Sequence, residues 1–226
     1  MRFTAAIMLV GSVASLGFAG TAQATHFTGW YAGIEGGINS ISDAKVGNDT
    51  IDPFWGGGFA PTVAKFGAGG AVLGTAGWSW PTFRVEGELG YRWNDLNDFL
   101  VFGTNYTGGG KLNEFSTMIN FLWNPALSST VDFSLGAGLG GDSINYKNDS
   151  GWHTVPIHDT DFVFAWQLIA GLSYHVPALS GDLFVNYRYF NADSPTFTEY
   201  DGASRLHDDS YEDLHKHTFT IGIRFH

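Results

Sequence analysis

Hydrophobic and polar residues alternate with a period of two along much of this chain. In residues 82–93, Phe83, Val85 and Leu89 fall on one side, whereas Arg84 and Glu86 fall on the other. Strict alternation indicates a β-strand rather than a helix. A strand with one bulky apolar side and one side of compensating charges fits three settings: a sandwich in water, the wall of a soluble barrel, or the wall of a barrel surrounded by lipid.

The same alternation predicts eight strands, each about the nine to eleven residues, or more, that a tilted membrane strand needs. They lie near 28–39, 65–79, 82–93, 114–124, 130–141, 161–176, 182–191 and 214–225. The connections at 80–81, 124–129 and 177–181 are short, whereas those near 40–64, 94–113, 142–160 and 192–213 are long and polar. Short and long connections alternate, which predicts an all-β, eight-stranded antiparallel up-and-down transmembrane barrel with periplasmic turns and four extracellular loops.

The first residues predict the compartment. Arg2 precedes an apolar run from Ala5 to Ala19, and Ala22-Gln23-Ala24 has the small residues of a cleavage site. We predict a signal peptide over 1–24, cleaved after Ala24, and one barrel domain over 25–226. A retained anchor is the alternative, but the apolar run is shorter than the roughly 20 residues of a spanning helix.

Composition narrows the function. The formal net charge is −11, which disfavours nucleic acid as a partner. The chain has no cysteine, so a regular hydrogen-bonded framework must replace disulfides in an exported protein. The 31 glycines, 16% aromatic residues and only 15% charged residues make a poor solvated surface, so the apolar side is expected to face something other than water.

The two sides of the strands predict two groups of residues. Aromatic residues gather near strand ends, as in the girdles at the two interfaces of a bilayer. Charged residues share the opposite side and, in a barrel of eight strands, are expected to fill the interior as a hydrogen-bonded plug rather than to line an open channel. The girdle comprises Trp30, Trp78, Trp80, Trp93, Trp123, Trp166, Tyr174 and Tyr189; the interior charge network comprises Glu35, Arg84, Glu86, Glu88, Arg92, Glu114, Asp132, Arg188 and Arg224.

Several segments resemble a known family. Gly29-Trp30-Tyr31-Ala32-Gly33, the segment 84–91, Asn186-Tyr187-Arg188-Tyr189 and the closing segment 220–225 look like the outer membrane protein β-barrel domain family of Gram-negative bacteria, whose members are often labelled porin-family or OmpA-like. The resemblance covers the whole mature chain and implies roles in envelope integrity, surface antigenicity or adhesion. It also implies that Phe219, Ile221, Ile223 and Phe225 form the C-terminal signal read by the outer membrane insertion machinery. Here His226 follows the aromatic residue with which the family usually ends.

The sequence supports a catalytic or metal-binding site less strongly than it supports the barrel. Ser204 with His207 and Asp208 or Asp209, and Ser173 with His175, are the only serine and histidine groups that suggest a hydrolase. His215 and His217 share a strand side, after an acidic segment that includes Glu212 and Asp213, but a Zn²⁺ or Ca²⁺ site needs three or more converging ligands. The glycines at 136, 138, 140 and 141 end a strand with no following helix, so we interpret them as space for the plug and not as a phosphate loop.

We therefore predict a non-enzymatic, cofactor-free, monomeric outer membrane barrel that acts in the envelope and at the cell surface. Its partners would be outer membrane lipid and lipopolysaccharide, the insertion machinery and an extracellular ligand bound through the loops, without nucleic acid. The alternatives are a narrow passive pore for small solutes, a lipid A-modifying barrel enzyme, and a soluble periplasmic barrel that binds an apolar ligand inside.

Overall fold

The computed structural model describes residues 27–47, 50–51, 58–59, 62–101, 103–125, 127–128, 130–148, 157–201, 204–212 and 214–226. The predicted signal peptide, 1–24, lies outside the described residues. Among the residues described, no helix is long and apolar enough to cross a membrane.

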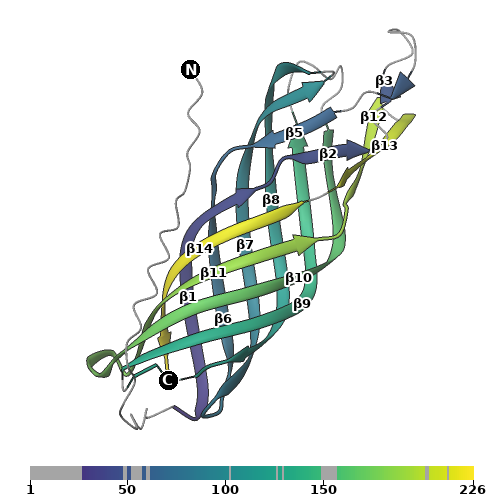
Figure 1. Cartoon of the computed structure of the whole chain (residues 1–226). Coiled ribbons are helices and arrows are strands. Elements are labelled where there is room, and N and C mark those ends of the chain that lie inside the picture. The colour runs from purple at the N-terminus through teal and green to yellow at the C-terminus, as the bar shows by residue number, and fades with distance from the viewer. Residues whose placement is uncertain are drawn as a thin grey trace, which may run out of the picture.

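Eight long antiparallel strands close into one barrel (Figure 1). They are β1 (Gly29–Ile41), β6 (Gly69–Ser79), β7 (Phe83–Val101), β8 (Thr104–Trp123), β9 (Val131–Asn148), β10 (Ile157–Val176), β11 (Gly181–Ala192) and β14 (His215–Phe225). Each pairs with its neighbour in the ring β7-β6-β1-β14-β11-β10-β9-β8, and the pairing of β7 with β8 closes it. The predicted fold class, strand number and up-and-down order are confirmed.

Short connections lie at one end of the barrel, which we call the turn end. The β10–β11 connection contains a 3-10 turn, η2 (Pro177–Leu179), after which Ser180 adopts a left-handed conformation with φ 46°. The end of β14 lies at the same end, where the backbone N–H of His226 donates to the carbonyl of Ser180 at 3.2 Å. Four further strands extend the wall at the other end, the loop end (Figure 1): β2 (Ala44–Gly47), β5 (Thr62–Phe66), β12 (Thr196–Asp201) and β13 (Ser204–Glu212). A separate pair, β3 (Thr50–Ile51) and β4 (Gly58–Phe59), completes the described elements.

The predicted loops were too long. Much of 94–113 belongs to β7 and β8, which continue to Val101 and resume at Thr104, and much of 142–160 belongs to β9 and β10. The physical reason is that the two sides of the sheet exchange character there. Leu96 and Leu112 point inward and are buried, while Asp95 and Lys111 point outward. The alternation therefore continues, but its polar side now faces out, as it does in a barrel surrounded by water.

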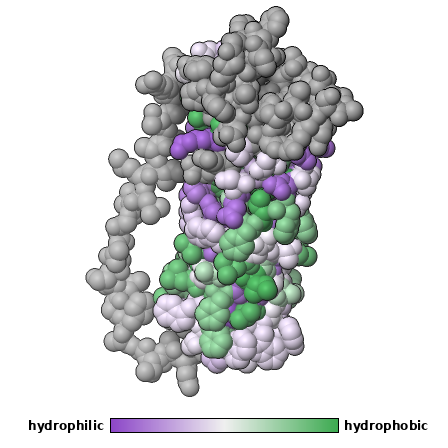
Figure 2. Space-filling model, turned by 90° about the vertical axis from the view of Figure 1, so that its right-hand side faces the viewer, coloured by the Kyte–Doolittle hydropathy of each residue, from purple (hydrophilic) through white to green (hydrophobic). Residues whose placement is uncertain are grey.

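The outer surface follows this exchange. Between the two ends, apolar side chains cover the outside of the barrel, and polar side chains replace them toward the loop end (Figure 2). Ile34, Ile119, Leu139 and Ile221 are all at least 60% exposed. We call this surface the apolar band.

Candidate functional site

The middle of the barrel interior holds a hydrogen-bonded group of charged and amide side chains, which we call the lumen network. The members contributed by β1, β7, β8, β10, β11 and β14 are all buried. They are Tyr31, Glu35, Arg84, Glu86, Glu88, Arg92, Asn120, Gln167, Asn186, Arg188 and Thr220.

Arg188 lies at the centre of the lumen network. Its guanidinium forms a bidentate contact with Glu35, at 2.5 Å from Nη2 to Oε1 and 2.8 Å from Nη1 to Oε2. Its Nε also donates to Glu88 Oε2 at 3.3 Å. Because β7 and β11 stand opposite each other in the ring of eight, the contact between Arg188 and Glu88 spans the whole lumen.

Amides and a tyrosine extend the network toward the turn end. Asn120 donates to Glu86 at 3.2 Å and to Glu88 at 3.0 Å, which links the two carboxylates. Tyr31 donates to Glu86 at 2.6 Å, and Arg84 contacts the same carboxylate at 3.3 Å. Buried charges are tolerated where opposite charges and hydrogen bonds compensate them, and here both do so.

Gly138 provides space for this packing. It lies on β9, and a Cβ atom placed there would meet the Asn120 side-chain amide and would lie 3.1 Å from Gln167. The interpretation of these glycines as space for the plug therefore holds at Gly138. At Gly136 and Gly140 a Cβ atom would instead meet Leu122 and Met118, together with backbone atoms. Gly141 differs, because a Cβ atom there would meet the outward-facing Phe162 ring.

A second charged level lies closer to the loop end. Lys216 is fully buried and pairs with Glu114 and, at 3.2 Å, with Asp142. Its strand, β14, and the strand of Glu114, β8, are also opposite each other in the ring, so this pair crosses the lumen as well. Arg92 packs over the Phe190 ring at 4.2 Å, and Lys216 lies 4.9 Å from the same ring.

Toward the loop end most of the buried interior is apolar, although the same cluster also includes Met118, which lies on the turn-end side of Glu114 on β8. We call the buried group there the apolar cap: Ile41, Ala44, Val46, Ala64, Leu96, Val101, Leu112, Met118, Ile144, Tyr146, Val163, Ala165, Phe190, Ala192, Phe197 and Leu214. Tyr146 stacks on Phe197, which comes from the loop-end strand β12, at 5.2 Å. Residues of three loop-end strands, β2, β5 and β12, thus join residues of the barrel strands in one small hydrophobic core.

Sequence reasoning placed nine charged residues inside, and the structure distributes them among four places. Six of them, Glu35, Arg84, Glu86, Glu88, Arg92 and Arg188, meet in the lumen network. Glu114 lies in the second level, and Arg224 lies at the turn end over the rings of Tyr31 and Phe184. Asp132 is only half-buried, on β9 opposite Ser173.

Asp142 and Lys216 were missed. Asp142 fell in a predicted loop. Lys216 stands between two outward-facing histidines near the start of the last strand. The alternation of β14 could have revealed it, because Lys216 shares the inward side with Thr218 and Thr220.

The predicted aromatic residues lie on the outer surface, in two groups. Trp30, Trp78 and Trp80 pack edge to face near the turn end, at 5.4 and 6.4 Å between ring centres. Trp166 and Tyr189 pack at 5.6 Å nearer the loop end. Trp93, Trp123 and Tyr174 are also exposed, as are Phe219, Ile221 and Phe225 of the predicted assembly signal, whereas Ile223 is half-buried.

The structure describes the side chains of only some of the candidate catalytic and metal-binding residues. Ser204, His207, Asp208 and Asp209 belong to β13, but their side chains lie outside the described part of the structure. Ser173 is buried, whereas the neighbouring inward residue His175 directs its Nδ1 to Asp182 Oδ1 at 3.1 Å. His215 and His217 lie on the outer face of β14, where they contact Asn191 at 2.6 Å and Tyr187 at 2.8 Å.

A further polar group lies at the turn end. Asp182 contacts His175, Arg224 at 3.3 Å, and His226, whose Nδ1 is 3.9 Å from Asp182 Oδ2. Burial lowers the pKa of His226 below its usual value, with Arg224 and His175 acting in the same direction and Asp182 opposing them.

Comparison with known proteins identifies the barrel. The family described as the outer membrane protein beta-barrel domain matches residues 8–226. The chain belongs to the outer membrane β-barrel domain family. The apolar band therefore lies in the hydrocarbon of the bacterial outer membrane, as the sequence predicted.

Solved structures of the same architecture agree. Neisserial surface protein A is 17% identical, with 88% of this chain and 97% of that chain covered and a TM-score of 0.50. OprG from Pseudomonas aeruginosa is 13% identical, with 89% and 98% covered and a TM-score of 0.58. The outer membrane protease OmpT from Escherichia coli is 11% identical, with 92% and 99% covered and a TM-score of 0.52. At these identities the likeness shows the fold alone, and no curated protein matches the chain.

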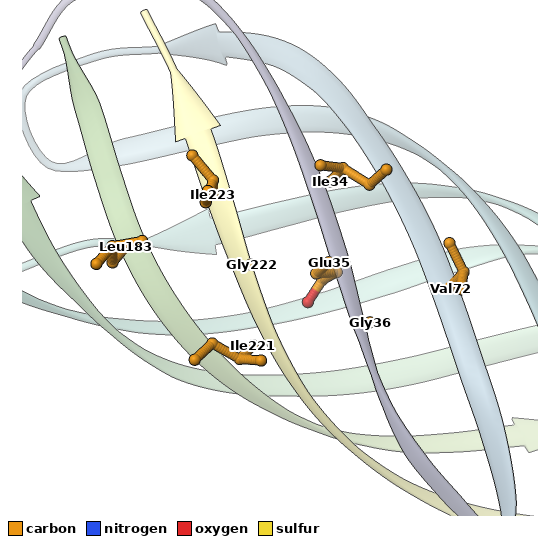
Figure 3. Close-up of a pocket in the computed structure, with 8 residues that line it drawn as sticks. All are labelled: Ile34, Glu35, Gly36, Val72, Leu183, Ile221, Gly222 and Ile223. Carbon is orange, nitrogen blue, oxygen red and sulfur yellow. The ribbon is translucent and has the colours of Figure 1, made fainter. Parts of the chain in front are cut away.

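An apolar groove runs along the outside of this outer membrane barrel (Figure 3). Ile34, Val72, Leu183 and Ile221 form its sides, and the small residues Gly36 and Gly222 lie between them. Glu35 also borders the groove, but its buried carboxylate belongs to the lumen network. Because the groove opens on the apolar band, lipid acyl chains will fill it. It is part of the membrane anchor and offers no polar group for chemistry on its open side.

Proposed function

We propose that this outer membrane barrel is a closed, non-enzymatic envelope protein that anchors in the lipid and presents its loop end outside the cell. The contact of Arg188 with Glu88 is the observation that best supports this role. It joins opposite walls of an eight-stranded ring, so at that level side chains occupy the width through which a solute would pass.

Two further levels support a closed lumen. The pair of Lys216 and Glu114 also bridges opposite strands, and most of the apolar cap lies on its loop-end side. Ions cross an apolar constriction poorly because it offers no groups to replace their hydration. A passive pore would need all three levels to rearrange.

The surfaces suggest the partners. The apolar band suits outer membrane lipid, and the aromatic residues at its two edges suit the interfaces next to the headgroups and lipopolysaccharide. The outward residues Phe219, Ile221 and Phe225 alternate along the last strand, as expected of a segment that the insertion machinery reads. We further propose a monomer whose loop end binds an extracellular ligand and does not bind nucleic acid.

Conductance separates this function from a pore. The full-length mature protein, reconstituted in a planar bilayer beside a true porin as positive control, should show no steady conductance. A steady conductance whose ion selectivity changes in Glu88→Gln would refute the closed barrel, because Glu88 lies inside the lumen. A conductance that Glu88→Gln leaves unchanged would come from a contaminating channel.

Enzymatic activity requires a separate test, because the fold is shared with the protease OmpT. The reconstituted protein should leave lipopolysaccharide and model peptides chemically unchanged by mass spectrometry. Cleavage that is lost in Ser173→Ala or Ser204→Ala would contradict the proposal and identify the nucleophile.

A further inference from the structure

The group at the turn end has the composition of a metal site. His175, Asp182 and His226 each offer one ligand atom, and these three atoms lie within 4.8 Å of one another. Two imidazoles and a carboxylate are a donor set that Zn²⁺ and similar borderline divalent ions prefer. We call these three residues the rim cluster.

The backbone fixes the rim cluster in place. His175 is the second-last residue of β10, Asp182 is the second residue of β11 and pairs with it, and His226 follows β14, the next strand in the ring. The backbone hydrogen bond from His226 to Ser180 holds the end of β14 against the β10–β11 turn. Three adjacent strands thus bring the ligands together before any ion arrives.

The distances suit a small ion. Ligand atoms about 2.0–2.2 Å from a tetrahedral Zn²⁺ lie roughly 3.3–3.5 Å from each other. The observed separations are 3.1 Å from His175 Nδ1 to Asp182 Oδ1 and 3.9 Å from His226 Nδ1 to Asp182 Oδ2. The three ligand atoms lie within 4.8 Å of one another, so side-chain rotations that bring them closer by up to about 1 Å would place them at three corners of the tetrahedron.

The two histidine rings stand side by side next to one carboxylate. Their rings stack with an angle of 19° and centres 5.7 Å apart. Asp182, which contacts both, is also contacted by Arg224 at 3.3 Å. Two stacked imidazoles can therefore direct a nitrogen each toward an ion that the same carboxylate also binds.

Solvent can reach the rim cluster, and neighbouring residues hold two of its ligands in position. The His175 side chain is 37% exposed, which gives an ion a route from solvent and leaves room for a water molecule as fourth ligand. Arg224 donates a hydrogen bond to one Asp182 oxygen, and Phe27 stacks on His226 at 4.3 Å. Neighbouring residues that would not bind the ion therefore help to fix the orientation of both ligands.

We propose that the rim cluster binds a divalent metal ion of the Zn²⁺ type at the periplasmic end of the barrel. The ion would tie the end of β14 to the β10–β11 turn. This site is independent of the closed lumen, so it stands or falls separately from the proposed function.

Zn²⁺ alone is the probe. The untagged full-length mature protein, refolded in detergent, is titrated with Zn²⁺ against a chromophoric chelator, and Co²⁺ is added in parallel to report tetrahedral coordination through its visible absorption. The wild type should bind a single tight Zn²⁺ per chain. His226→Gln and Asp182→Asn should each weaken that binding by at least about tenfold, because a ligand is lost.

His217→Gln is the matched control, because it removes a histidine from the same strand on the outer face. It should leave the affinity within about twofold of the wild type. Heat-dependent mobility in detergent gels checks that each variant is folded, and His175→Gln, at a side chain that is 37% exposed, changes a ligand without altering the lumen network. Absence of tight Zn²⁺ binding in the wild type, or binding that folded His175→Gln and His226→Gln retain in full, would overturn the proposal.

Discussion

Removing Glu35 should destabilise the barrel more than any surface change. The Glu35 carboxylate accepts two hydrogen bonds from Arg188, one from Thr220 at 2.5 Å and one from Asn186 at 3.1 Å, and it is 3% exposed. In Glu35→Ala, Arg188 would keep only Glu88, at 3.3 Å, to balance its charge. Breaking a buried pair by removing one partner typically costs about 3–5 kcal/mol, and we expect a loss in this range.

The reciprocal change and the double variant make this test specific. Arg188→Ala leaves the Glu35 and Glu88 carboxylates without their shared cation, so it should cost a similar amount. The double variant should cost far less than the two single changes together, with an interaction energy of at least about 2 kcal/mol.

Urea titration in lipid vesicles provides the assay. The tryptophan emission of the chain, which contains 8 Trp residues, reports folding, and the free energy of unfolding follows by linear extrapolation. Lys111→Ala, on the polar outer surface, is the control and should stay within about 0.5 kcal/mol. Additive single changes, or losses below about 1 kcal/mol for both, would refute the packed lumen network.

Three other predictions follow from the same structure. Leu135→Arg places a charge on the apolar band, where the native side chain is 43% exposed, and should cost about 2–4 kcal/mol in the same titration; a neutral result would contradict the assignment of the lipid-facing side. Glu86→Ala should cost about 3–5 kcal/mol, because it leaves buried Arg84 without its carboxylate, and retention of full stability would count against the pair. Because the chain has no cysteine, Lys111→Cys at the loop end should react with a membrane-impermeant maleimide on intact cells, whereas Leu179→Cys at the turn end should not; the opposite pattern would reverse the orientation.

Alternation predicted the strands of the apolar band well because lipid outside and a polar plug inside impose opposite demands on neighbouring residues. Ile119 and Asn120 are adjacent on β8, yet one is 69% exposed to the outside and the other is fully buried. The same rule placed Glu35 and Arg188 inside, although it could not show that their side chains meet. That contact depends on strand register, which period-two patterns leave open.

The sequence-based prediction of the loop end was wrong for a physical reason. There the polar side of each strand faces out, so Asp95 and Lys111 made the segment resemble a loop while Leu96 and Leu112 were building the apolar cap. The alternation typical of a soluble barrel, with polar residues outside and apolar residues inside, is therefore found at the loop end of the described structure. The rim cluster was equally hidden, because His175, Asp182 and His226 come together only through the pairing of three strands; the one sign was His226 in place of a terminal aromatic residue.

A spin-label scan along β8 tests the central claim most directly: the apolar band contacts hydrocarbon, the interior is packed, and the outer surface becomes wet toward the loop end. Nitroxides placed singly at 117 and 119 should collide with oxygen and not with a water-soluble nickel complex, one at 116 should be shielded from both, and one at 111 should be reached by the nickel complex. This pattern follows from the burial of Ser116, the exposure of Ile119 and the polar outer side at Lys111. Access of the nickel complex to 116 would mean a water-filled lumen, and access to 117 and 119 would place the apolar side in water, so either result would contradict the account.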